Sequence, residues 1–199
     1  MQTTPNFDFE AQAPHPVCGV DEVGRGPWAG PVVAAAVILD PAHIPAGMND
    51  SKKLTAARRE LLFEAISAAA VVSIGAASVT EIDRINILQA SFLAMRRAVA
   101  GLPTPPAFAL IDGNKIPPGL PCAAQAIIKG DGRAFSIAAA SIIAKVTRDR
   151  LMCDLSATYP GYGWETNMGY PSKNHRLALQ NLGVTPHHRR TFKPVHNML

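Results

Sequence analysis

Three apolar segments of strand length each end in an acidic residue close to glycine, and this recurrence limits the possible folds more than any other feature. The acids are Asp21 with Glu22 after residues 17–20, Asp112 after residues 107–111 and Asp131 after residues 123–128. Sites in α/β proteins gather outside the carboxyl ends of the strands. We therefore expect a sheet that brings these four carboxylates together at one edge.

Such a cluster of carboxylates favours a divalent cation. The four groups would repel one another and shift toward their protonated forms unless a cation neutralised them. Hard oxygen ligands select Mg²⁺ or Mn²⁺, which leave positions open for water and phosphate. Taken singly, Asp112 can be an ordinary turn residue and Asp131 can cap the following helix. The coincidence of three strand ends favours the metal site.

A glycine-spaced basic turn follows the first two acids. In a regular strand Asp21 and Glu22 point to opposite faces, so they share a site only if the strand ends or bends there. Gly24 and Gly26 can supply that break, and their N–H groups together with Arg25 can hold an anion. The alternative is a surface turn in which Arg25 pairs with an acid. A nucleotide-binding loop is disfavoured because GxGxxG spacing is absent.

The rest of the chain alternates between helical and extended patterns. Helices are expected over residues 55–70, 80–100, 133–158 and 172–182, and further strands over 32–39 and 71–79. A capping box between Thr80 and Asp83 is expected to begin the second helix. With 199 residues, of which 48% are hydrophobic, the chain suits one substantial core.

Positive charge is concentrated at the C-terminal end. The net charge is +4, and the segment from Thr166 onward contains no acid but five basic residues, Lys173, Arg176, Arg189, Arg190 and Lys193. This distribution favours an anionic partner such as nucleic acid. Further candidate phosphate contacts are Lys52, Lys145 and Arg148, although Lys145 can instead pair with Asp149 four residues later. The aromatic and glycine-rich segment 159–171 suits a loop that presents a ring to a base or sugar.

Cysteine usage and hydropathy bear on the compartment. The three cysteines have no metal-ligand spacing, and His187 and His188 lack partners for a zinc site. This pattern indicates a reducing cytosol, so we expect a cytoplasmic protein. No apolar run reaches the ~20 residues of a membrane span.

Eight motifs, taken in order from Gly19 to Val195, resemble those of the bacterial ribonuclease HII family, the type 2 ribonucleases H. They are GVDEVGRGPWAGPVV, NDSKKL, EIDRINIL, LIDGN, KGD, SIAAASIIAKVTRD, YGW with GYPS, and HHRRTFKPV. The resemblance implies an α/β, ribonuclease H-like fold with a central mixed five-stranded sheet flanked by helices. It also implies a catalytic domain over 17–160 and a small, basic, helical C-terminal extension over 161–199 packed on the same domain. The composition of residues 1–16, with no basic or apolar run, separately predicts a loose, flexible tail.

The implied activity is endonucleolytic. A member of this family would cut the RNA strand of RNA·DNA hybrids, and would cut 5′ of single ribonucleotides embedded in duplex DNA. Two-metal-ion hydrolysis would leave 5′-phosphate and 3′-hydroxyl ends. A non-catalytic nucleic-acid-binding module on the same fold is the alternative, and we expect a monomer in either case.

Family roles transfer to individual positions of this sequence. Two divalent ions, Mn²⁺ or Mg²⁺, would be held by Asp21, Glu22, Asp112 and Asp131. Gly24, Arg25 and Gly26 would contact the ribonucleotide, in part through its 2′-hydroxyl, and Tyr170 would stack on the next sugar. Apart from the family roles, we expect Lys52, Lys53, Lys145, Arg148 and the basic tail to hold phosphates because of their charge. Two departures are Met168, where a basic residue is common, and Ala134-Phe135 in place of more polar residues.

Overall fold

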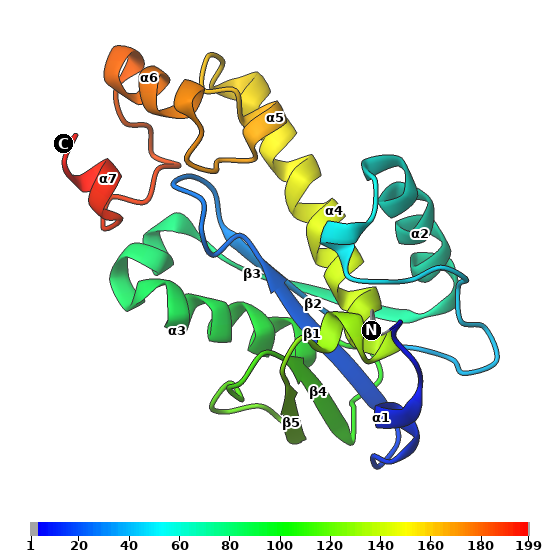
Figure 1. The fold of residues 1–199 in the computed structure, drawn as a ribbon. Helices are drawn as coiled ribbons and strands as arrows, with labels where there is room; N and C mark the ends of the chain where they lie inside the picture. Colours follow the sequence, from blue (N-terminus) through cyan, green and yellow to red (C-terminus); the bar gives the residue numbers. More distant parts are fainter. Residues whose placement is uncertain (1–3, 199) are drawn as a thin grey trace.

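A mixed five-stranded sheet forms the centre of the molecule, with strand order β3-β2-β1-β4-β5 (Figure 1). The computed structural model describes residues 4–198. The strands are β1 (Val17–Val23), β2 (Val32–Ile38), β3 (Val71–Ala77), β4 (Phe108–Asp112) and β5 (Ala123–Ile127). β1, β2 and β3 pair antiparallel, whereas β1, β4 and β5 run parallel. The expected mixed sheet is confirmed, and the carboxyl ends of β1, β4 and β5 share one edge.

Helices cover both faces of the sheet. They are α1 (Asp8–Ala11), α2 (Ala56–Ala69), α3 (Val79–Ala100), α4 (Phe135–Thr158), α5 (Trp164–Asn167), α6 (Lys173–Leu182) and α7 (Lys193–His196), with 3₁₀ turns η1 (Ser51–Lys53) and η2 (Gly130–Gly132). In Figure 1, α3 lies on one face, and α2 and α4 lie on the other. Among the described residues, no helix has the length and apolar character needed to cross a membrane.

The unbroken apolar run of β2 follows from its central position. Ala34 and Ala36 pack beneath α3, while Ala35 and Val37 pack beneath α2 and α4. Because successive side chains of a strand point to opposite faces, a strand covered on both faces needs apolar residues at every position. The core therefore has two layers, one on each side of the sheet.

The beginning of α3 differs from the prediction. The capping box lies two residues earlier, between Ser78 and Glu81, and each side chain accepts a hydrogen bond from the other residue's backbone N–H. Asp83 instead accepts hydrogen bonds from the backbone of the C-terminal segment. The helix is also kinked at Asn86, whose φ is 67°, and the Asn86 side chain accepts from the N–H groups of Leu88 and Gln89.

The N-terminal segment is not loose over the described residues 4–16. It forms the short helix α1 and pairs with the chain at Ala134, and the side chain of Glu10 is buried. The sequence suggested a tail because the segment contains no long apolar run. Phe9 and Ala13 are partly buried against a cluster of residues from β1, β4, β5 and α4.

The C-terminal elements α5, α6 and α7 pack on the turn between β1 and β2. Their cluster contains Trp28 and Ala29 from that turn, together with Met152, Tyr162, Trp164, Ala178, Leu179 and Val195. His175 and His188 are buried in the same region and contact each other through their Nε2 atoms at 3.1 Å. Both histidine rings pack among the aromatic rings of Tyr162 and Trp164.

Candidate active site

Three of the four predicted acids converge at the carboxyl ends of the parallel strands. Asp21, Asp112 and Asp131 each offer a carboxylate oxygen, and these three atoms lie within 4.8 Å of one another. The last pair between β1 and β4 joins Val20 to Ile111, so the acids begin where these strands stop pairing. The geometry expected from the strand ends is therefore present for these three residues.

Hydrogen bonds to the backbone fix the acids. Asp112 Oδ1 accepts from the N–H of Gly130 at 2.7 Å, which ties the end of β4 to the η2 turn that carries Asp131. Asp21 Oδ1 accepts from the N–H of Glu22, also at 2.7 Å. The first of these bonds holds Asp112 and the turn that carries Asp131 together through the main chain.

The electrostatics of this cluster favour neutralisation. Burial raises the pKa of Asp21 well above its usual value, and the charges of Glu22, Asp112 and Asp131 raise it further. Burial and the charge of Asp112 likewise raise the pKa of Asp131. Hard, buried, mutually repelling oxygen donors match the preferences of Mg²⁺ and Mn²⁺, so the residues present fit a divalent-ion site.

Glu22 lies beside the cluster and on the other side of the strand. β1 remains a regular strand through Val23 and is paired with β2 over that length. The bend between Asp21 and Glu22 that would have placed both acids in one site is therefore absent. Glu22 lines a cavity of about 240 Å³ with Asp112 and Arg25, and its Oε1 lies 3.3 Å from the Arg25 guanidinium. Burial raises the pKa of Glu22, and the charge of Arg25 opposes that effect. Asp112 borders both the cavity and the acid cluster.

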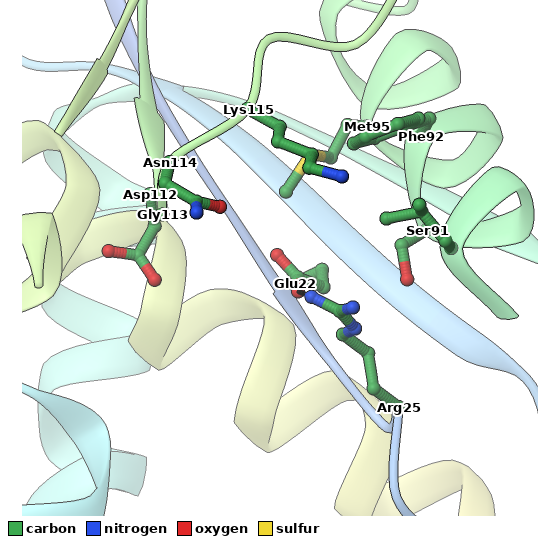
Figure 2. A pocket seen from close by; sticks show the side chains of 10 residues that line it. Glu22, Arg25, Ser91, Phe92, Met95, Asp112, Gly113, Asn114 and Lys115 are labelled. Carbon is green, nitrogen blue, oxygen red and sulfur yellow. Dashed lines mark hydrogen bonds and ion pairs between the residues drawn. The ribbon is translucent and has the colours of Figure 1, made fainter. Parts of the chain in front are cut away.

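The lining of the cavity at Glu22 includes two basic residues, Arg25 and Lys115. Figure 2 shows the Glu22 and Arg25 side chains between the Asp112–Lys115 loop and residues Ser91, Phe92 and Met95 of α3. Arg25 pairs with Glu22, which is the contact expected if Arg25 lies in a surface turn and pairs with an acid. That same contact places the guanidinium next to the candidate metal site.

A second cavity of about 190 Å³ is lined by both Asp21 and Glu22. Its lining includes Lys52, Lys145 and Tyr170, three of the predicted substrate contacts. The Lys52 ammonium lies 3.7 Å from Asp131 Oδ2. Lys145 pairs with Asp149 at 2.8 Å, as its alternative interpretation proposed, and still borders the cavity.

Local structure explains the position of Lys52. Asp50 caps the η1 turn by accepting from the N–H of Lys52, and the Ser51 hydroxyl lies 2.7 Å from the Ser141 hydroxyl of α4. Although desolvation acts against the charged form, the nearby carboxylates, led by Asp21 and Asp131, raise the pKa of Lys52. The NDSKKL motif therefore delivers a charged ammonium to the acid cluster.

The prediction that Arg148 contacts phosphate is wrong. Its side chain is fully buried, and its guanidinium donates hydrogen bonds to the backbone oxygens of Pro31, Ala29 and Met168 at 2.9–3.0 Å. Desolvation by burial lowers its pKa. The sequence gives no sign that two loops bury this arginine in the middle of a helix. A prediction based on its charge alone therefore placed it wrongly at the phosphate.

Arg189 is a residue that sequence reasoning placed in the exposed basic tail. It is fully buried, and its guanidinium donates to the backbone oxygens of Gly24, Arg25 and Gly30. Arg148 and Arg189 together hold the Gly24–Gly26 turn against the loop that carries Tyr170. No sequence signal separates Arg189 from Arg190, which follows it and is exposed.

The glycine turn and the tyrosine lie in contact. A Cβ atom built on Gly26 would lie 3.5 Å from the Tyr170 ring, and Tyr170 is 39% exposed. The N–H of Trp28 donates to the Gly169 oxygen at 2.8 Å. Met168, which stands where a basic residue was expected, adopts φ 51° and packs in the C-terminal cluster.

Comparisons with known proteins converge on one family. A family model described as ribonuclease HII matches residues 18–195. The chain is 66% identical over 201 residues to a ribonuclease HII of Ruegeria pomeroyi, covering 99% of this chain and 86% of that protein. It is 61% identical over 195 residues to one of Jannaschia sp., covering 98% of each.

Solved structures agree with the sequence relatives. The ribonuclease H2 of Pyrococcus horikoshii superposes with a TM-score of 0.76 and 30% identity, covering 92% of this chain and 96% of that one. A Bst-RNase HIII solved with Mn²⁺ gives a TM-score of 0.72 at 21% identity, covering 92% of this chain and 68% of that one. The latter likeness bears on the fold alone.

Proposed function

Because this chain belongs to the ribonuclease HII family, and is therefore a metal-dependent ribonuclease H, we propose that it cuts by two-metal-ion hydrolysis. The proposed substrates are RNA·DNA hybrids and duplex DNA containing single ribonucleotides, cut on the 5′ side of the ribonucleotide. The products would carry 5′-phosphate and 3′-hydroxyl ends. The observation that carries this proposal is the convergence of three carboxylate oxygens within 4.8 Å.

The proposed metal ligands are Asp21, Asp112 and Asp131, with Glu22 completing the set from the neighbouring cavity. Bound Mg²⁺ or Mn²⁺ would lower the pKa of the attacking water and stabilise the leaving 3′-oxygen. The raised pKa values of Asp21, Glu22 and Asp131 support a site that needs positive charge. Lys52 supplies part of that charge beside Asp131.

Recognition is proposed for the surfaces around the cluster. The Gly24–Gly26 turn would contact the ribonucleotide and its 2′-hydroxyl, which distinguishes RNA from DNA. Tyr170, in contact range of Gly26, would stack on the following sugar. Lys52 and Lys145 would hold phosphates, so affinity should fall steeply as salt concentration rises.

The domain division is also a proposal. Residues 17–160 would form the catalytic unit, and 161–199 would form a basic extension packed on it. The extension contributes Tyr170 to the second cavity, and its Arg189 holds the glycine turn. We further propose that the protein is a monomer and that it is cytoplasmic; the three free cysteines support a reducing compartment.

The test uses an end-labelled DNA duplex that contains one ribonucleotide. Wild-type protein, Asp21→Asn and a surface control, Asp154→Asn, are incubated with it in Mg²⁺, in Mn²⁺ and in EDTA. We expect a metal-dependent cut 5′ of the ribonucleotide with wild type and the control, and no cut with Asp21→Asn. Binding of the duplex without cleavage in either metal would contradict the proposal and support a non-catalytic binding module.

A further inference from the structure

The first turn of α4 contacts the segments that carry two of the metal-site acids, Asp131 and Asp21. The η2 turn carries Asp131 and leads directly into this helix, and the N–H of Ala134 donates to the Gly130 oxygen at 2.9 Å. On its other side, the turn packs against β1. A Cβ atom on Gly19 would lie only 2.1 Å from the Ser136 carbonyl carbon, and Gly19 is two residues before Asp21. The position of this turn therefore influences both acids.

The turn has no cap of its own. The first N–H groups of a helix have no acceptor within it, and the residue before the helix usually supplies one from a polar side chain. Here that residue is Ala134, which carries no acceptor. Ala134-Phe135, which stands where the family has more polar residues, thus leaves the helix without a side-chain cap.

The N-terminal segment supplies the missing acceptors from far along the chain. Glu10 Oε1 accepts a hydrogen bond from the N–H of Ser136 at 2.7 Å. The backbone oxygen of Asn6 accepts from the N–H of Phe135 at 3.0 Å, and the N–H of Asn6 donates to the Arg133 oxygen at 3.1 Å. Figure 1 shows this segment beside the start of α4. The first two orphan donors of the helix are both satisfied by residues 6–10.

Burial and packing hold residues 6–10 against the start of α4. Glu10 is 1% exposed, and the Arg133 guanidinium lies over the Phe9 ring at 4.9 Å. Phe9 also packs on the cluster formed by Val17, Leu110, Ile127, Ala134 and Ile137. Burial of a carboxylate is costly unless hydrogen bonds compensate it. Across the described residues, the second oxygen of Glu10 has no partner, so its bond to Ser136 is the compensation that it receives.

We propose that Glu10 is a positioning residue for the divalent-ion site. By capping α4 from across the chain, it holds the η2 turn so that Asp131 stays beside Asp21 and Asp112 before a cation arrives. Without the cap, repulsion among these acids would favour a frayed first turn and a displaced Asp131. Since only the competent fraction binds, apparent metal affinity falls in proportion. The inference rests on the metal site proposed above.

The experiment is a calorimetric titration of the metal-free protein with Mn²⁺. Glu10→Ala removes the cap, whereas Glu10→Gln keeps a side-chain oxygen that can accept from Ser136. We expect Glu10→Ala to weaken Mn²⁺ binding about 3- to 10-fold, the size of a lost helix cap. Glu10→Gln should stay within about twofold of wild type, because the acceptor is retained.

Matched controls separate positioning from general stability. The same two substitutions at Glu64, whose side chain is 70% exposed and pairs with Arg150 toward the far end of α4, change charge and size away from the first turn of that helix. Val99→Ala opens a cavity in the buried layer beneath α3 and should lower the melting temperature without changing Mn²⁺ affinity. Hydrogen exchange of the Ser136 amide should accelerate in Glu10→Ala alone.

The outcomes distinguish the two proposals. If wild type binds Mn²⁺ and Glu10→Ala binds it equally well, the positioning role is overturned and the metal site stands. If Glu10→Gln is as weak as Glu10→Ala, the capping account is overturned. If wild type binds no Mn²⁺, the metal site itself is wrong, and the inference falls with it.

Discussion

Replacing Arg189 by lysine tests one of the two fully buried arginines that the sequence did not predict. Arg189 and Arg190 are adjacent, yet the first is fully buried and the second is exposed. Arg190→Lys is therefore a matched control with the same chemical change. We expect Arg189→Lys to destabilise the protein and to impair cleavage, and Arg190→Lys to do neither.

The magnitude follows from the hydrogen bonds. The Arg189 guanidinium donates to three backbone oxygens, those of Gly24, Arg25 and Gly30, and no carboxylate pairs with it among these partners. The lysine ammonium is a compact point charge, so it cannot donate hydrogen bonds in the planar geometry of the guanidinium. Losing one or two charged hydrogen bonds costs about 2–4 kcal/mol. For a chain of this length, that loss lowers the melting temperature by roughly 5–15 °C.

The assay has two parts. Thermal unfolding is measured for wild type and both variants, and cleavage of the single-ribonucleotide duplex is measured well below all three melting temperatures. Since misplacement of a recognition group by about 1 Å can cost up to about 100-fold in rate, we expect Arg189→Lys to cleave at least about tenfold more slowly. Equal melting temperatures for the two variants would refute the reasoning, because the buried guanidinium would then contribute no more than an exposed one.

Two further predictions concern the acids and the glycine turn. Burial, followed by neighbouring carboxylates, raises the pKa of Asp21 in the fold, so the stability of the metal-free protein should fall as pH rises above about 4. Asp21→Asn should consequently melt higher than wild type at pH 8 in EDTA, and an unchanged melting temperature would contradict this. Gly24 has φ 95° and abuts the Arg148 side chain, so Gly24→Ala should lower the melting temperature. Gly26→Ala adds a methyl group in ordinary contact with the Tyr170 ring, so it should impair cleavage of the ribonucleotide substrate more than folding.

The part of the site that was predictable from the sequence depends on local order along the chain. Short apolar runs that end beside glycine marked the strand ends, and parallel pairing of β1, β4 and β5 then placed Asp21, Asp112 and Asp131 at one edge. The eight family motifs independently gave the fold class, which the sheet and the comparisons confirm. Strand formation and helix periodicity depend on neighbouring residues, so a single sequence carries this information.

Other features required knowledge of which distant segments meet. The continuation of β1 through Val23, which sends Glu22 to the opposite face, depends on pairing with β2. Arg148 and Arg189 look like surface charges in the sequence, and only the loops that close over them make their partners backbone oxygens.

Glu10 gives the clearest example, since 126 residues separate it from the N–H group that it binds. The sequence determined which segments become strands and helices and which acids stand at the strand ends. Only the tertiary structure decided which polar groups are buried and what they bind, because a buried polar group takes its hydrogen bonds from whichever segments fold beside it.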